Sequence, residues 1–201
     1  VTLIGLAGVT QAQSLKFAGT QIPGAPVVNL KINGAAADVT PVGLKFTDGT
    51  STFLTYCIEP TRGLNNAYHN YTTSVIDLNG GTGLSLAAKI MAEGIATADT
   101  RDEQAGLQLA IWEALYDFGG SFSSDGPGMK ILGGANANVL GFASSYYTLG
   151  KNSNTNKTVL KFSTDEPGGQ GQMYVVPEPA TMLALGAGAA FLARRRRKTS
   201  K

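Results

Sequence analysis

The chain has 201 residues, of which only 15% are charged, and it contains one cysteine. Six of its 16 basic residues lie at 194–201 and one of its 14 acidic residues is Glu178, which leaves 10 basic against 13 acidic residues elsewhere. The body is therefore slightly acidic and offers no basic face for nucleic acid. A single cysteine also excludes an intrachain disulfide framework.

Residues 1–13 have the composition of the end of a secretory signal peptide. An apolar stretch is followed by small residues, and cleavage is expected after Ala12. A buried N-terminal strand is the alternative interpretation. We expect an exported chain and exclude residues 1–13 from the fold.

The first half of the mature body has the pattern of short β-strands. Its apolar or alternating segments are separated by Gly, Pro, Asn and Asp, and they lie at 15–17, 27–32, 42–46, 52–58 and 68–78. The dipeptide Asp48-Gly49 predicts a hairpin turn between two of them. Two closing strands are expected at 158–163 and 172–176.

Three helices are expected between these groups of strands. Apolar residues at helical spacing predict the first over 84–98, and a third is expected over 135–149. Between them, Thr100 and Glu103 fit a capping box that opens a helix to about Phe118. The sequence predicts an α+β fold, an antiparallel sheet or barrel with a helical insertion. We place this domain at 14–163 and a linker with a final strand at 164–176.

Two segments stand out for their chemistry. One is Tyr56-Cys57-Ile58-Glu59 at the end of a predicted strand, and the other is Leu107 to Leu115 on the capped helix. Gln108 lies on or beside the apolar stripe of that helix. A buried amide without partners costs about 1–3 kcal/mol, so Gln108 must find partners or react. A lone thiol in an exported protein should likewise be buried or chemically committed.

Together these segments resemble the thioester (TQXA-type) domains of bacterial surface proteins. Cys57 matches the family's cysteine, and Gln108, Ala110, Ile111 and Trp112 match its helix motif, with Leu107 where the family usually has Thr. The resemblance implies that the Cys57 sulfur attacks the Gln108 carbonyl, releases ammonia and leaves a thioester that a partner's amine or hydroxyl can open. Tyr56, Ile111 and Trp112 are the residues expected around this bond.

Other interpretations of these residues remain open. Cys57 could be a buried free thiol and Gln108 a helix glutamine bonded to backbone. A thiol hydrolase would need His69 beside Cys57, but His69 is expected at the surface. One Cys and one His make no zinc site, and Gly80-Gly81 and Gly83 lack a nucleotide-binding context. We therefore expect no metal, no cofactor and no enzymatic activity.

The C-terminal segment, 177–201, has three parts in a fixed order. Pro177, Glu178 and Pro179 form an extended, accessible motif, because proline fixes φ and restrains its neighbours. The apolar run at 180–193 predicts a short hydrophobic helix of roughly 20 Å, shorter than the ~30 Å hydrocarbon core. A basic stop follows, and it includes four consecutive arginines, Arg194, Arg195, Arg196 and Arg197. The positive-inside rule would place it in the cytoplasm.

This order of parts resembles the PEP-CTERM sorting signal of Gram-negative bacteria that make exopolysaccharide. The alternatives are an ordinary short tail anchor or a core helix with a basic flank. The resemblance implies processing by the membrane protease exosortase near Pro177–Pro179. It also implies an inner-membrane-anchored intermediate on the way to the cell surface or extracellular matrix.

These features lead to one preferred function and one alternative. We expect an exported adhesion or biofilm-matrix protein that attaches covalently, through a Cys57–Gln108 thioester, to a surface protein or polysaccharide. The alternative is a non-reactive structural or carbohydrate-binding protein of the exopolysaccharide matrix.

Overall fold

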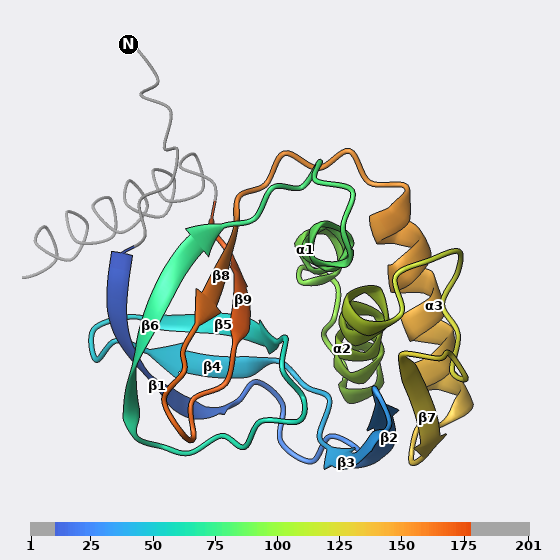
Figure 1. Cartoon of the computed structure of the whole chain (residues 1–201), viewed down its shortest axis with the longest axis horizontal. Helices are drawn as coiled ribbons and strands as arrows, with labels where there is room; N and C mark the ends of the chain where they lie inside the picture. Colours follow the sequence, from blue (N-terminus) through green and yellow to red (C-terminus); the bar gives the residue numbers. More distant parts are fainter. Residues whose placement is uncertain (1–10, 178–201) are drawn as a thin grey trace, which may run out of the picture.

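The computed structural model describes residues 11–177, which form a closed β-barrel beside a group of three helices, with a small separate sheet below the helices (Figure 1). This arrangement confirms the expected α+β fold with a barrel and a helical insertion. The core of the expected signal peptide, Glu178, Pro179, the apolar segment and the arginines lie outside the described residues.

Six antiparallel strands close the barrel in the order β1-β4-β5-β9-β8-β6. Their bounds are β1 (Gln11–Thr20), β4 (Leu44–Thr47), β5 (Thr52–Cys57), β6 (Tyr68–Val75), β8 (Val159–Ser163) and β9 (Gln172–Val175). The hairpin expected at Asp48-Gly49 joins β4 to β5, and Gly49 has the positive φ that such a turn requires. Because β9 pairs with both β5 and β8, the final strand is an integral part of the barrel.

Aromatic side chains hold strands of the barrel together. Tyr71 on β6 packs edge to face against Phe46 on β4 at 6.0 Å and against Phe162 on β8 at 6.4 Å. All three are almost completely buried. Edge-to-face pairs add to the free energy of burial, so this cluster contributes to barrel stability.

Strand β1 includes residues 11–13, which the sequence assigned to the signal peptide. In β1, Gln11 pairs with Thr73, Ala12 with Thr72 and Gln13 with Tyr71. Cleavage after Ala12 stays a prediction, and it would leave a strand that begins at Gln13.

The small sheet contains two strands that the sequence patterns did not predict. It has the order β3-β2-β7, formed by β2 (Val28–Ile32), β3 (Ala35–Val39) and β7 (Met129–Gly133). Asn33 and Gly34 both have positive φ, 48° and 90°, in the two-residue turn between β2 and β3. Asn-Gly in such a turn is a strong hairpin signal, and here it indicates that β3 follows β2.

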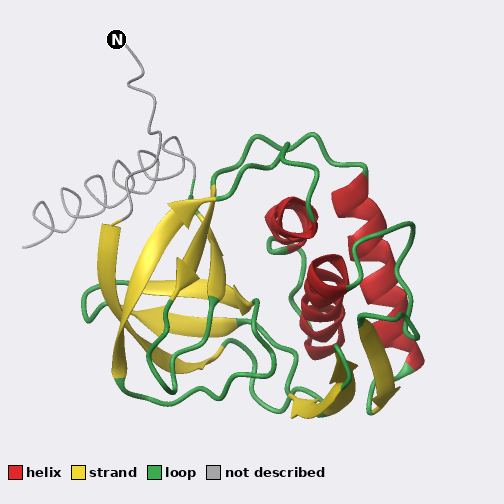
Figure 2. Cartoon of the chain, in the orientation of Figure 1, coloured by secondary structure: helices red, strands yellow, loops and turns green. Residues whose placement is uncertain are grey.

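The three expected helices are present, coloured red in Figure 2. They are α1 (Gly83–Gly94), α2 (Arg101–Tyr116) and α3 (Ala137–Lys151). The predicted capping box is confirmed: Thr100 Oγ1 accepts from Glu103 N–H, and Glu103 Oε2 accepts from Thr100 N–H. Helix α1 ends earlier than expected, because the Thr97 and Ala98 N–H groups both turn back to Gly94 O.

Helix α2 is the central helix and is buried along most of its length. A Cβ on Gly106 would lie 2.5 Å from Phe142 Cβ on α3, so glycine here lets the two helices approach closely. Its other side faces the barrel, and that side carries the candidate site.

Candidate functional site

Four polar or aromatic side chains recur at every fourth residue of α2. They form hydrogen bonds with backbone groups just before α2 and at the end of the barrel. Residues four apart lie on one face of a helix, so the spacing produces a single stripe. The stripe is Gln104, Gln108, Trp112 and Tyr116. Tyr116 Oη donates to Ile58 O at 2.9 Å, and Gln104 Oε1 accepts from Gly43 N–H at 3.3 Å.

Gln108 pairs with both sides of the Cys57 peptide. Its Oε1 accepts from Cys57 N–H at 2.9 Å, and its Nε2 donates to Cys57 O at 2.9 Å. The pairing between β4 and β5 reaches only Leu44 and Thr55, two residues before Cys57. The amide therefore takes the position that a strand partner would occupy if β4 began before Leu44.

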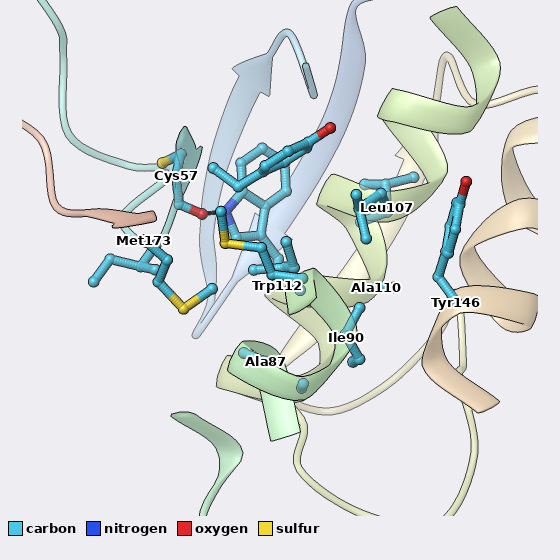
Figure 3. Packing of buried hydrophobic residues seen from close by; sticks show 14 of the residues in the cluster. Cys57, Ala87, Ile90, Leu107, Ala110, Trp112, Tyr146 and Met173 are labelled. Atoms are coloured by element: carbon cyan, nitrogen blue, oxygen red, sulfur yellow. Dashed lines mark hydrogen bonds between the residues drawn. The ribbon is translucent and has the colours of Figure 1, made fainter. Parts of the chain in front are cut away.

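Trp112 completes this contact. Its Nε1 donates to Cys57 O at 2.9 Å, so that carbonyl accepts from Gln108 and Trp112 together. Figure 3 shows Cys57 next to Trp112, with Met173 on the barrel side and Leu107 and Tyr146 farther away among the helices. The polar contacts are thus surrounded by the hydrophobic core.

The Cys57 thiol is free and buried in this structure, and burial is one of the two states that the sequence led us to expect of a lone thiol. Burial raises its pKa well above the ordinary value, and the Glu59 N–H, which donates to Sγ at 3.2 Å, opposes this only in part. The sulfur is therefore a neutral thiol around neutral pH.

Cys57, Gln108 and Trp112 line one pocket of about 210 Å³. Asp38 and Val42 lie on one part of its wall, and Pro60, Arg62, Leu64 and Gln170 on another. Tyr56 and Ile111, which were expected around the bond, are buried but do not line this pocket. Tyr56 precedes Cys57 on a strand, where successive side chains point to opposite faces, and Ile111 lies on another side of α2 from the stripe.

Two loops that are far apart in sequence form the wall beside Cys57. Arg62 donates to Thr164 O and, at 2.9 Å, to Glu166 O, and it forms an ion pair with Glu59 at 3.3 Å. Gln170 Nε2 donates to Glu59 O and Arg62 O at 3.0 and 2.8 Å. These bonds hold the loop after β5 against the loop between β8 and β9.

His69 does not lie at the surface, so that expectation was wrong. It is 6% exposed, because the same two loops cover it. Its Nδ1 faces Glu166 Oε2 at 3.1 Å and its Nε2 faces Asn65 Oδ1 at 2.8 Å. Within residues 11–177 no hydrogen bond joins His69 to Cys57, so a Cys–His dyad has no support in this geometry.

The remaining sequence-predicted site residues belong to the tail. Pro177 is the last described residue, and Glu178, Pro179 and Arg194–Arg197 lie beyond it. Of the helices within 11–177, none combines the length and the apolar character needed to cross a bilayer. Over the same range, no group of three or more His, Cys, Asp or Glu side chains is arranged to hold a metal ion.

Comparison with known proteins identifies the tail. Residues 175–198 match the PEP-CTERM protein-sorting motif. No curated protein matches the chain in sequence.

Two solved structures resemble the chain. One is the N-terminal domain of the Streptococcus pyogenes pilus tip adhesin Cpa, with 13% identity, a TM-score of 0.49, and coverage of 81% of this chain and 99% of that one. The other is the N-terminal thioester domain of a surface protein from Clostridium perfringens, with 10% identity, a TM-score of 0.48, and coverage of 83% and 100%.

Proposed function

We propose that this chain is a cell-surface protein, sorted through its PEP-CTERM motif, that forms an internal thioester between Cys57 and Gln108 and uses it to attach covalently to a partner. The motif at 175–198 implies sorting by exosortase to the surface. The observation that carries the reactive part is the contact between the Gln108 amide and the Cys57 peptide in a shared pocket.

The bond-forming step is an acyl transfer from nitrogen to sulfur. Cys57 Sγ adds to Gln108 Cδ, the Cδ–Nε2 bond breaks, and the thiol proton leaves with Nε2 as ammonia. No oxidant or cofactor is needed. The two hydrogen bonds that join Gln108 to the Cys57 backbone restrict the amide beside the residue that carries the nucleophile, which reduces the entropy cost of the reaction.

The Cys57 N–H supports the same step electrostatically. It already donates to Gln108 Oε1, the atom on which negative charge develops when sulfur attacks. A donor fixed at this position stabilises the tetrahedral intermediate in a site with little water. Trp112 Nε1 and Gln108 Nε2 both donate hydrogen bonds to the Cys57 carbonyl, which keeps that peptide in place.

Burial would also protect the thioester until a partner arrives. The raised pKa of Cys57 makes its thiolate a poor leaving group, since thiols with lower pKa values leave faster. Gln108 is fully buried and Trp112 is 2% exposed, which limits access by water.

The pocket supplies a route for the attacking group. An amine or hydroxyl of the partner would add to Gln108 Cδ, the C–S bond would break, and the proton would pass to the departing sulfur. The products are an amide or ester on the Gln108 side chain and a free Cys57 thiol. Asp38 is the carboxylate among the residues that line the pocket, and the charge of Arg62, which also lines it, is paired with Glu59. Asp38 would attract a cationic amine, which loses one proton to water before it adds to Cδ.

The wider setting is part of the proposal. We infer an inner-membrane-anchored intermediate, with Arg194–Arg197 as the stop, followed by release to the surface or to the exopolysaccharide matrix of a Gram-negative cell. The protein acts as a biofilm adhesin on a surface protein or polysaccharide. It works once as a covalent linker and is not an enzyme.

A non-reactive matrix protein is the second candidate. The intact Gln108 amide satisfies Cys57 N–H and Cys57 O completely, so the same contact can serve as a lock between α2 and the barrel. Methylamine distinguishes the two. The thioester form should become labelled at Gln108, located by peptide mapping, whereas wild-type protein that takes up no methylamine supports the lock.

A further inference from the structure

A second pocket lies where the first half of α1 meets the C-terminal ends of α2 and α3. It has a volume of about 310 Å³ and shares no lining residue with the Cys57 pocket. Its walls include Thr82 and Lys89 of the α1 region, Phe118 after α2, and Lys151 at the end of α3. This size is sufficient for a small organic ligand.

The charge around this pocket is unbalanced. Lys89 and Lys151 line it, and no carboxylate is among the lining residues. Across residues 11–177 neither lysine takes part in an ion pair, although Lys151 Nζ also donates to Gly120 O. Asp77 lies in an adjoining depression that Lys89 shares, and its Oδ1 accepts from Asn79 N–H. The pocket therefore favours an anion.

The other side chains that line this pocket are either apolar or carry a hydroxyl or an amide. Phe118 is 54% exposed, an unusual state for a large aromatic side chain, and Leu78 and Leu86 line the same pocket. Asn79 and Thr82 add an amide and a hydroxyl. A ligand that satisfies all of these groups has a flat apolar face, hydroxyls and a negative charge.

The walls are held by close contacts of backbone, so the pocket is preformed. A Cβ on Gly83 would lie 2.3 Å from Ala114 O of α2. A Cβ on Gly150 would lie 2.8 Å from Ile90 Cα of α1. Both glycines therefore bring helices together at distances that no other residue allows, and a preformed site loses little entropy when it binds a ligand.

We propose that this pocket binds a carboxylate-bearing sugar residue, such as a uronate unit of an acidic saccharide. Lys89 and Lys151 pair with the carboxylate, Phe118 covers the C–H face of the ring, and Asn79 and Thr82 bond ring hydroxyls. This binding does not depend on the thioester, because the two pockets are separate.

The test uses trigalacturonate and its methyl ester, which is the same saccharide without charge, in NMR titrations of the full-length protein. Trigalacturonate should shift the amides of Gly81, Gly119 and Gly150, and the methyl ester should not. Lys89→Ala, Lys151→Ala and Phe118→Ala should each weaken the affinity by about three- to tenfold. Lys31→Ala, which changes an exposed lysine on β2, should leave it unchanged, as should Cys57→Ala.

Circular dichroism of each variant establishes that it is folded before its affinity is compared. The proposal would be overturned if the ester bound as well as trigalacturonate, or if trigalacturonate did not bind. It would also be overturned if the Lys89, Lys151 and Phe118 variants had the same affinity as the wild type. Shifts centred on the Cys57 pocket would do so as well.

Discussion

Gln108 is joined to Cys57 by two hydrogen bonds of 2.9 Å, one to the N–H and one to the C=O of the same peptide. A helix side chain thus replaces a strand partner at the end of β5. Because the residue that carries the thiol and the residue that carries the acyl carbon are fixed to each other, stability and reactivity depend on the same contact.

Gln108→Ala should destabilise the domain by about 2–4 kcal/mol, because it leaves the buried Cys57 N–H without an acceptor and removes buried side-chain volume. Denaturant unfolding monitored by Trp112 fluorescence measures this. Gln104→Ala is the matched control: it is one turn away, equally buried and also hydrogen-bonded, but it does not contact Cys57. It should also lower the unfolding free energy but leave methylamine uptake intact, whereas Gln108→Ala removes the acyl group and should abolish uptake. Loss of uptake in both variants would argue against a specific role for Gln108.

Trp112→Phe tests the protection of the bond. The change removes the Nε1 bond to Cys57 O, which is worth about 1 kcal/mol, and it opens space in the wall of the pocket. We expect a modest fall in unfolding free energy and faster hydrolysis of the thioester, followed as recovery of full mass with time. A hydrolysis rate equal to that of the wild type would show that Trp112 does not restrict water.

Asp38→Asn tests whether the pocket selects a cationic amine. Asp38 lies on the pocket wall, where Asn29 Nδ2 donates to its Oδ1 at 2.5 Å. Removing the charge should slow labelling by methylamine, which is a cation at neutral pH, by about two- to fivefold. Labelling by hydroxylamine, which is neutral under the same conditions, should not change. Equal slowing of both reagents would indicate a structural effect instead.

Glu113 should make stability depend on pH. Burial raises the pKa of its carboxyl to about 7 from 4.5; the Ser123 N–H bond opposes this rise, and Asp117 adds to it. Since the folded state holds this proton more tightly than the unfolded state, stability is greatest below about pH 4.5 for this group and is lost as the pH rises through about 7.

Glu113→Gln keeps an oxygen for the Ser123 N–H and removes the titration. Relative to wild type, the variant should gain up to about 2 kcal/mol between pH 4.5 and pH 8, after allowance for solvent screening. Thermal unfolding over this range measures the difference. A constant difference between the two proteins across the range would contradict the assignment.

Most of the barrel and all three helices could be predicted, because their signals are local. Alternation identified the barrel strands, and the cap at Thr100 with Glu103 located the start of α2. Strand β3 was missed since Ala35-Ala36-Ala37-Asp38 has no alternation, although the Asn33-Gly34 turn before it was a usable signal. Strand β7 follows a glycine- and serine-rich loop and pairs with β2 about 100 residues earlier, which no local pattern reveals.

The site was predictable in part for the same reason. Cys57 and Gln108 each lie in a recognisable segment. The spacing of four residues along α2 would also have identified Gln104 and Tyr116 as members of the stripe. The pocket wall could not be predicted, because Arg62 binds Thr164, a residue 102 positions away. The burial of His69 has the same origin, since Glu166 and its loop come from the far end of the domain.

Intact-mass spectrometry of freshly purified, folded protein shows whether the bond between Cys57 and Gln108 has formed. We expect a wild-type mass lower by one ammonia than the sequence requires, with no thiol that reacts with iodoacetamide, and the full sequence mass for Cys57→Ala. Full mass in the wild type, together with a Cys57 that is alkylated after unfolding without any loss of ammonia, would contradict it.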